Sequence, residues 1–85
     1  MSNVQIFGTT WCGDCHRAKR VLEGLKVPYT WVDVDQDALG LALVVKVAGK
    51  RKVPVIVFPD ESTLVEPSNP ELIRKVEEMG LAPKP

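Results

Sequence analysis

The hydrophobic pattern of the first 34 residues changes from that of a strand to that of a helix and back again. Residues 4–7 are mostly apolar and lead into Gly8, Thr9 and Thr10. A helical spacing follows, with apolar residues three, four and seven positions apart. These residues are Ala18, Val21, Leu22 and Leu25. After Pro28, aromatic and β-branched residues indicate a second strand over 29–34. A strand, helix, strand unit of this kind predicts two parallel strands.

The rest of the chain predicts a second helix, two strands and a third helix. Three carboxylates supply the expected cap and first turn of the second helix, which runs to about Ala48 and ends at Gly49. These are Asp33, Asp35 and Asp37. Residues 55–58 form a continuous apolar run, which is typical of a strand buried on both faces, and 63–65 suggest an antiparallel return strand. The sequence Ser-Asn-Pro-Glu at 68–71 fits a capping box at the start of the last helix.

The order βαβαββα predicts an α/β fold with a four-stranded mixed sheet and helices on both faces. We expect one domain over residues 1–80 and a flexible tail over 81–85. Eleven basic and eleven acidic residues cancel, so the net charge predicts binding to neither nucleic acid nor an anionic membrane. No apolar run approaches the length of a membrane span, and the first residues do not resemble an export signal, so we expect a cytoplasmic protein.

The only two cysteines, Cys12 and Cys15, stand at Cys-x-x-Cys spacing at the expected start of the first helix. Two residues between them let the sulfurs close a short redox disulfide, and the helix N-terminus favours a thiolate. We therefore predict that Cys12 is the catalytic nucleophile and that Cys15, one turn further in, is the buried resolving thiol. The neighbouring Asp14 opposes a thiolate and Arg17 favours it, so the balance of these two charges stays open.

Cys12, Cys15 and His16 also match the attachment motif of c-type haem. That interpretation is disfavoured because haem attachment normally implies export and the strand-rich pattern does not suit a helical cytochrome. A mononuclear zinc site would need a fourth ligand, and the chain has no further Cys or His, so no metal site is predicted. His16 itself either assists the thiolate or is a solvated surface residue.

The motif Trp-Cys-Gly-x-Cys at 11–15, the dipeptide Val53-Pro54 before the third strand and the length of the chain resemble glutaredoxins of the thioredoxin fold. Residues 62–64, followed by Pro67 and Ser68, are most similar to the glutaredoxin-like mycoredoxins. The resemblance covers nearly the whole chain. It implies a thiol–disulfide oxidoreductase with no tightly bound cofactor and with a low-molecular-weight thiol, mycothiol or glutathione, as co-substrate.

The resemblance also implies roles for Val53 and Pro54, and the local sequence suggests roles for Trp11, Ser68 and Asn69. Pro54 would follow a cis peptide bond beside the nucleophile, and Val53 would offer its backbone to a substrate chain. Trp11 would shield Cys12 and present a flat face to the substrate, unless it is a packing aromatic. Glutaredoxins carry a Gly-Gly pair and an acidic residue where this chain has residues 65–69, so glutathione recognition is in doubt. Ser68 and Asn69 could bind a polar or anionic part of another thiol, although Ser68 alone could simply cap the helix.

We therefore predict an enzyme that reduces protein disulfides, or mixed disulfides between a protein and a small thiol. One alternative is a small redoxin that thioredoxin reductase reduces directly, of the type that donates hydrogen to ribonucleotide reductase. A second alternative is a glutaredoxin-like module that carries an iron–sulfur cluster between two subunits. The second helix is apolar on two sides. Leu39, Leu43 and Val47 suit the core, and a second stripe predicts a homodimer or docking surface. That stripe consists of Ala38, Leu41, Ala42, Val45 and Ala48.

Overall fold

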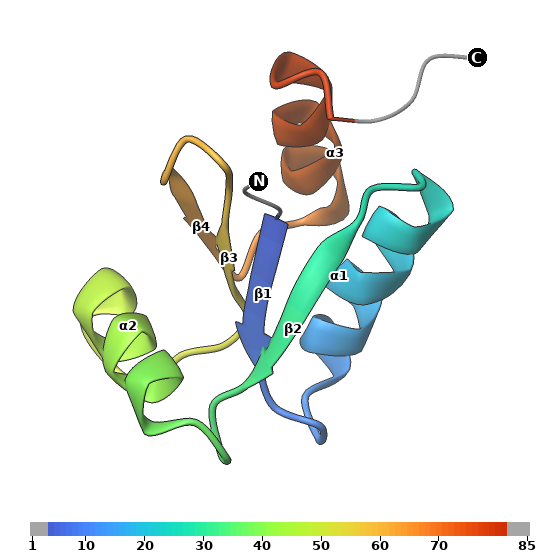
Figure 1. Ribbon diagram of the computed structural model, residues 1–85. Helices are drawn as coiled ribbons and strands as arrows, with labels where there is room; N and C mark the ends of the chain where they lie inside the picture. Colours follow the sequence, from blue (N-terminus) through green and yellow to red (C-terminus); the bar gives the residue numbers. More distant parts are fainter. Residues whose placement is uncertain (1–3, 82–85) are drawn as a thin grey trace.

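The computed structural model describes residues 4–81 and contains the seven elements that the sequence predicts, in the predicted order (Figure 1). They are β1 Val4–Gly8, α1 Gly13–Gly24, β2 Tyr29–Asp33, α2 Ala38–Ala48, β3 Val55–Val57, β4 Thr63–Val65 and α3 Asn69–Glu78. The predicted α/β fold class, with four strands and three helices, is confirmed. Residues 82–85 of the predicted tail lie outside the described residues.

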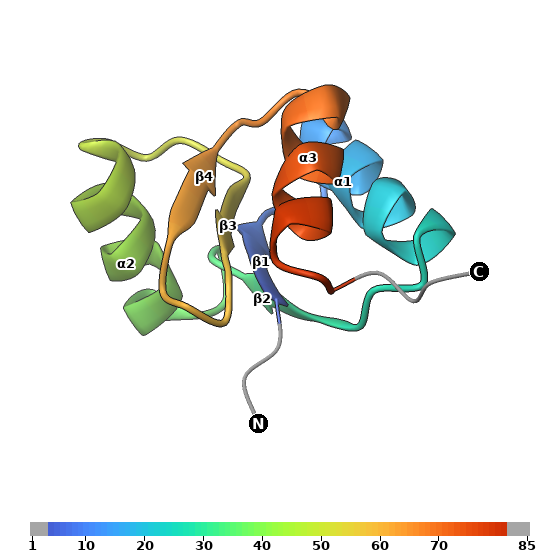
Figure 2. The same cartoon turned by 90° about the horizontal axis from the view of Figure 1, so that it is seen from above.

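The four strands form one mixed sheet in the order β2-β1-β3-β4. β1 pairs with β2 in parallel, and β3 runs antiparallel to both β1 and β4. α2 covers one face of the sheet, and α1 and α3 lie together on the other face (Figure 2). The central strands β1 and β3 are therefore covered on both faces, as the continuous apolar run of β3 predicts.

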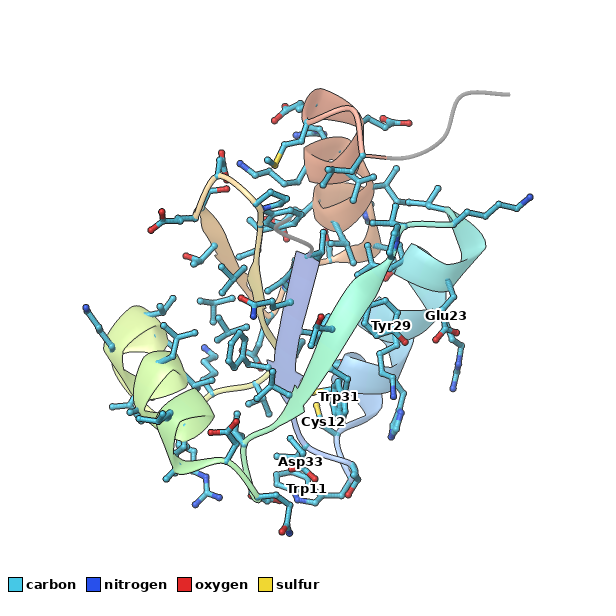
Figure 3. All side chains as sticks on the ribbon, in the orientation of Figure 1. Trp11, Cys12, Glu23, Tyr29, Trp31 and Asp33 are labelled. Carbon is cyan, nitrogen blue, oxygen red and sulfur yellow. The ribbon has the colours of Figure 1, made fainter. Side chains whose placement is uncertain are left out.

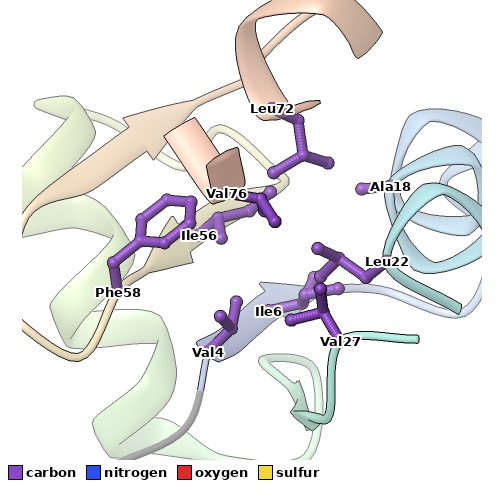
Figure 4. Packing of buried hydrophobic residues seen from close by; sticks show 9 residues of the cluster. All are labelled: Val4, Ile6, Ala18, Leu22, Val27, Ile56, Phe58, Leu72 and Val76. Atoms are coloured by element: carbon purple, nitrogen blue, oxygen red, sulfur yellow. The ribbon is translucent and has the colours of Figure 1, made fainter. Parts of the chain in front are cut away.

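Two hydrophobic clusters fill the spaces between the sheet and its two helical layers. Successive side chains of a strand point to opposite faces, so Ile6 belongs to the cluster under α1 and α3 and Phe7 to the cluster under α2. The same alternation divides Ile56 from Val55. Burying each large apolar side chain contributes about 1.5 to 3 kcal/mol. Figure 4 shows the buried residues of the first cluster, which are Val4, Ile6, Ala18, Leu22, Val27, Ile56, Phe58, Leu72 and Val76.

The packing of α2 differs from the prediction. Leu39, which we expected in the core, is 84% exposed, whereas Val44 is fully buried and Gly40 is buried against the sheet. A Cβ atom at Gly40 would lie 2.9 Å from Cγ1 of Val32, so the glycine lets this side of the helix approach β2 closely. The sheet therefore selects the face that carries Gly40 and Val44, and Leu39 is turned away from it.

The remaining apolar residues of α2 divide between the core and the surface. The expected core residues Leu43 and Val47 are partly buried against the second cluster, and so are Leu41 and Ala48 of the predicted outer stripe. The exposed apolar residues of α2 are Ala38, Leu39, Ala42 and Val45, next to the exposed Lys46. We call these four apolar residues the α2 apolar surface.

The ends of the helices follow local hydrogen-bonding rules, with one departure from the prediction. Asp37 caps α2, because its side chain accepts a hydrogen bond from the backbone N–H of Gly40 at 3.0 Å. Asp33 and Asp35 lie before the helix and take no part in its first turn. At the other end of the chain, Leu81 donates its N–H to the carbonyl of Val76 at 3.1 Å and packs against the first cluster.

Candidate active site

Cys12 is the N-cap residue of α1 and lies just beyond the C-terminal end of β1 (Figure 3). Its backbone is extended, with φ −89° and ψ 115°, so the chain turns from the strand into the helix at this residue. The Cys12 Sγ accepts a hydrogen bond from the backbone N–H of Cys15 at 3.2 Å. One of the unpaired N–H groups of the first helical turn is thus directed at the sulfur, an arrangement that favours negative charge there.

The two cysteines occupy different environments. Cys12 is partly exposed, whereas Cys15 is completely buried under the first turn of α1, and neither is in a disulfide. Burial raises the pKa of the Cys15 thiol to about 12, and the hydrogen bond and charge of Cys12 act in the same direction, against a lowering by a backbone hydrogen bond with Thr9. Cys15 therefore stays a protonated thiol at neutral pH, while Cys12 is the sulfur that a substrate can reach.

The Val53-Pro54 segment lies beside the exposed cysteine. The peptide bond between these residues is cis, as predicted. The carbonyl oxygen of Val53 is 4.0 Å from the Sγ of Cys12, although 41 positions separate the two residues in the sequence. Pro54 is buried and Val53 is partly exposed. The fold thus brings together two segments that we singled out separately in the sequence.

Trp11 stands on the open side of the site and is 72% exposed. Its indole Nε1 donates a hydrogen bond to Oδ2 of Asp35 at 2.9 Å, and Nη2 of Arg51 contacts the other oxygen of the same carboxylate at 2.7 Å. The ring is therefore held by a surface contact rather than by packing in the core. This placement matches the expected flat face toward a substrate better than the alternative of a packing aromatic.

His16 and the charged residues of α1 have partners other than the sulfur of Cys12. The Nε2 of His16 lies 2.6 Å from the carbonyl oxygen of Thr10 and donates to it, since a carbonyl can only accept. Asp14 forms an ion pair with Arg17 at 3.5 Å. The two opposite charges therefore offset each other in part, although the charge of Asp14 still acts to raise the pKa of Cys15.

Ser68 has the structural role that we weighed as its alternative. Its side chain accepts from the N–H of Glu71 at 3.3 Å, and its own N–H donates to the Glu71 carboxylate at 2.8 Å, which completes a capping box. The hydrogen bond from the Ser68 N–H lowers the pKa of Glu71. Asn69 is the first residue of α3. Arg17 connects α1 to the segment just before α3, because its Nη2 donates a hydrogen bond to the carbonyl of Pro67 at 3.3 Å.

Comparison with known proteins decides the family. The glutaredoxin family model matches residues 4–63. The chain belongs to the glutaredoxin family. Members of this family are thiol–disulfide oxidoreductases, and the Cys12–Cys15 pair lies within the matched region, so the chain is a glutaredoxin-like redox enzyme.

This glutaredoxin is similar to several proteins of nearly the same length. A glutaredoxin homologue of Mycobacterium tuberculosis is 38% identical over 74 residues, which cover 86% of this chain and 88% of the relative. Mycoredoxin 1 of Corynebacterium glutamicum is 36% identical over 81 residues, or 94% of this chain and all of the relative. The fold is similar to that of the Escherichia coli NrdH-redoxin, with a TM-score of 0.74, 23% identity and coverage of 99% and 100% of the two chains.

Gly8 is the last residue of β1 and lies against both Cys15 and Trp31 in this glutaredoxin. A Cβ atom there would lie 2.4 Å from the Sγ of Cys15 and 2.9 Å from Cη2 of Trp31. Gly8 therefore makes room for the buried sulfur and for the ring across the neighbouring strand. Its position immediately after the apolar run of β1 is the only signal in the sequence, because the contact with Trp31 depends on strand pairing.

Asp35 and Arg51 were also missed as neighbours of the site. Asp35 was assigned to the start of a helix, but the loops that carry Asp35 and Arg51 meet at Trp11. Within residues 4–81, no three His, Cys, Asp or Glu side chains gather in a way that would hold a metal ion. No helix in the same part of the chain is long and apolar enough to cross a membrane.

Proposed function

We propose that this glutaredoxin reduces disulfides within proteins, or mixed disulfides between a protein and a small thiol, with Cys12 as the attacking sulfur. The observation that supports this assignment is the asymmetry of the pair. Cys12 is accessible at a helix N-terminus, and Cys15 is buried with its pKa raised to about 12. One sulfur is therefore suited to attack from solvent and the other to act only within the enzyme.

The reaction has two steps. The Cys12 thiolate attacks one sulfur of the substrate disulfide, forms a mixed disulfide and releases the other substrate sulfur, which takes up a proton. Cys15, after giving up its proton, or an external thiol then attacks Cys12 Sγ and releases the second substrate thiol. Attack by Cys15 leaves the Cys12–Cys15 disulfide and a substrate reduced by two electrons. Two equivalents of a small thiol, or a reductase, return the enzyme to the dithiol.

A protein substrate would be held beside Cys12 by the Val53 backbone and by the face of Trp11. The carbonyl oxygen of Val53 lies at van der Waals distance from the sulfur of Cys12. The Trp11 ring is exposed, and its hydrogen bond to Asp35 sets its orientation. An extended substrate chain that passes along Val53 would bring its own disulfide to Cys12. Pro54 follows Val53 and is buried, so it anchors the Val53 segment to the core.

Glutaredoxins use thiol co-substrates, and we propose that mycothiol serves this enzyme better than glutathione. The similarity to mycoredoxin 1 supports this choice. In addition, residues 65–69 lack the Gly-Gly pair of glutathione-binding glutaredoxins. The hydroxyl of Ser68 is engaged in the cap of α3, which leaves Asn69 as the freer polar side chain at this corner.

Direct reduction by thioredoxin reductase is the second candidate. The absence of the Gly-Gly pair fits it equally well, and the E. coli NrdH-redoxin, whose fold is similar, is described as a glutaredoxin-like protein with a thioredoxin-like activity profile. In either case the chemistry requires a compartment that keeps thiols reduced, for which we propose the cytoplasm. A homodimer through the α2 apolar surface is a separate proposal, based on the exposure of Leu39 and Val45.

A reductant panel tests the proposed function. A peptide disulfide is offered to the enzyme with glutathione, mycothiol, bacillithiol, or thioredoxin reductase and NADPH as the only source of electrons. We expect turnover to be fastest with mycothiol. Efficient turnover with the reductase alone would favour the second candidate, and a preference for glutathione would mean that residues 65–69 replace the usual binding site. Absence of turnover with every reductant would contradict the oxidoreductase assignment.

A further inference from the structure

Glu66 has a backbone conformation that is unfavourable for its residue type. Its φ angle is 46°, in the left-handed region, where a side chain crowds the backbone. Residues with this strain persist where the surrounding contacts hold them, and they often do so at functional sites. Glu66 immediately follows β4 and leads into the corner at Pro67, so it lies between the sheet and the start of α3.

Both contacts that hold Glu66 reach the segment around Val53. The backbone N–H of Glu66 donates to the carbonyl of Pro54 at 2.9 Å, and its carboxylate forms an ion pair with Nζ of Lys52 at 3.1 Å. Lys52 and Pro54 are the two chain neighbours of Val53. Glu66 therefore fastens the chain on either side of the residue whose carbonyl oxygen lies 4.0 Å from Cys12 Sγ.

We propose that Glu66 is a positioning residue that sets the Val53 backbone beside Cys12 and thereby favours disulfides carried on a peptide chain. The proposal rests on the proposed function and deepens it, because it names the residue pair that selects the substrate class. A small disulfide has no chain to lay along Val53, so it gains little from this positioning. A peptide disulfide needs the segment in place before the sulfur can be attacked.

The solvent exposure of the Lys52–Glu66 ion pair limits its expected effect on peptide selectivity. The side chains of Lys52 and Glu66 are 42% and 38% exposed, so solvent screens part of their attraction. Pairs of this kind have modest energies, and we expect about a three- to five-fold loss of peptide selectivity when the pair is removed. The loss should appear in substrate affinity rather than in the limiting rate, because the reacting sulfurs are unchanged.

Two substitutions remove the Glu66 carboxylate, one with the backbone strain kept and one with it relieved. Glu66→Gln keeps the side chain and removes the charge, whereas Glu66→Gly removes the side chain and permits the left-handed backbone without strain. Enzyme reduced beforehand is mixed with a peptide disulfide or with bis(2-hydroxyethyl) disulfide, and the single-turnover rate is measured as a function of substrate concentration. No recycling thiol is then needed. We expect both variants to weaken peptide binding about three- to five-fold while the limiting rate and the rate with the small disulfide change less.

Glu61→Gly is the matched control, because Glu61 also has a positive φ, of 70°, but lies in the turn between β3 and β4. The peptide-to-small-disulfide ratio should not change in this variant. Exchange of the pair, Lys52→Glu with Glu66→Lys, should recover the ratio at least in part. A peptide-to-small-disulfide ratio that stays unchanged in the Glu66 variants, with or without equal losses on both substrates, would overturn the inference. Wild-type enzyme that reduces neither disulfide would instead contradict the proposed function itself.

Discussion

Single residues at the end of β1 and in the first turn of α1 create the chemical difference between the two cysteines. The Sγ of Cys12 accepts a hydrogen bond from a backbone N–H of the helix. The Sγ of Cys15 occupies space that a side chain at Gly8 would fill. Asp14 and Arg17 form an ion pair nearby, and the charge of Asp14 also acts to raise the pKa of Cys15. Burial and hydrogen bonding are thus the largest differences between the two sulfurs, and nearby negative charge is a smaller one.

Alkylation of the reduced enzyme should distinguish the two sulfurs directly. During brief treatment with iodoacetamide at neutral pH, we expect Cys12 to be labelled and Cys15 to be protected, because only Cys12 is accessible. Peptide mapping by mass spectrometry measures the distribution of label. Cys12→Ser should abolish all reductase activity, whereas Cys15→Ser should keep the first step and accumulate the mixed disulfide. Preferential labelling of Cys15 would reverse the assignment.

The raised pKa of Cys15 predicts that the reduced protein loses stability at high pH. The folded state holds this proton up to about pH 12, whereas the unfolded chain releases it near its ordinary value of 9.0. The resulting stabilisation is complete below pH 9 and is lost as the pH rises toward 12, with a slope of at most about 1.4 kcal/mol per pH unit.

Urea unfolding of the reduced protein between pH 8 and pH 11 measures this slope. Tyr29 also contributes in this range, because its ordinary pKa of 10.0 applies in the unfolded chain, whereas burial and the hydrogen bond to Glu23 raise the pKa to about 12 in the folded protein. Cys15→Ala serves as the control, since it removes the thiol and leaves the tyrosine. We expect a shallower pH dependence in this variant. Identical pH profiles for the two proteins would contradict the buried, protonated state of Cys15.

At the scale of elements, the site depends on how helices begin and on which faces they bury. Cys12 is the N-cap of α1, and Ser68 is the N-cap of α3 with a complete capping box. Asp37 gives α2 a similar start, and Gly40 lets it approach β2. The helix ends are therefore encoded locally, whereas the depth at which α2 packs depends on the sheet beneath it.

Removal of the α3 cap should cost stability without changing the chemistry. We expect Ser68→Ala to destabilise the protein by about 1 kcal/mol. For a domain of this size the midpoint of thermal unfolding should then fall by about 4 to 8 °C. Calorimetry of the reduced protein measures the shift.

Ser68→Asp distinguishes a cap from a binding group. Aspartate caps helices as well as serine, so the unfolding temperature should stay near that of the wild type. If Ser68 also binds an anionic part of the thiol co-substrate, the added carboxylate should raise the KM for that thiol. An unchanged KM would limit Ser68 to its role in the cap.

At the scale of the whole molecule, the two helical layers differ in how completely they cover their apolar residues. The layer of α1 and α3 encloses a cluster of nine buried residues, which Figure 4 shows. The α2 apolar surface stays open, with Leu39 84% exposed. An open apolar face on one helix is where a second copy would bind if the proposed homodimer forms.

Sedimentation velocity tests the dimer, with a substitution that the structure allows us to choose. Leu41 packs against the second cluster, so a charge there would disturb the core, whereas Leu39 is free to change. We expect Leu39→Glu to shift the protein toward monomer at high concentration. Arg74→Gln on α3 changes the net charge equally and serves as the control. A wild-type monomer at all concentrations would remove the proposal.

The sequence by itself determined the order of elements, the parallel pairing of the first two strands and the redox pair. Each depends on short-range patterns: hydrophobic period, capping residues and the spacing of Cys12 and Cys15. The capping box at 68–71 is local in the same sense, since its two hydrogen bonds join residues three positions apart.

The tertiary structure alone decided the contacts between segments distant in the chain. Asp35 resembled a helix cap, but it holds Trp11 across 24 positions. Leu39 fitted the helical period of the core, but the close approach at Gly40 buries another face. Glu66 carried no signal until the fold placed it against Lys52 and Pro54. These roles depend on which loops and faces meet, and the periodicity of one element does not specify the register or the approach of its neighbours.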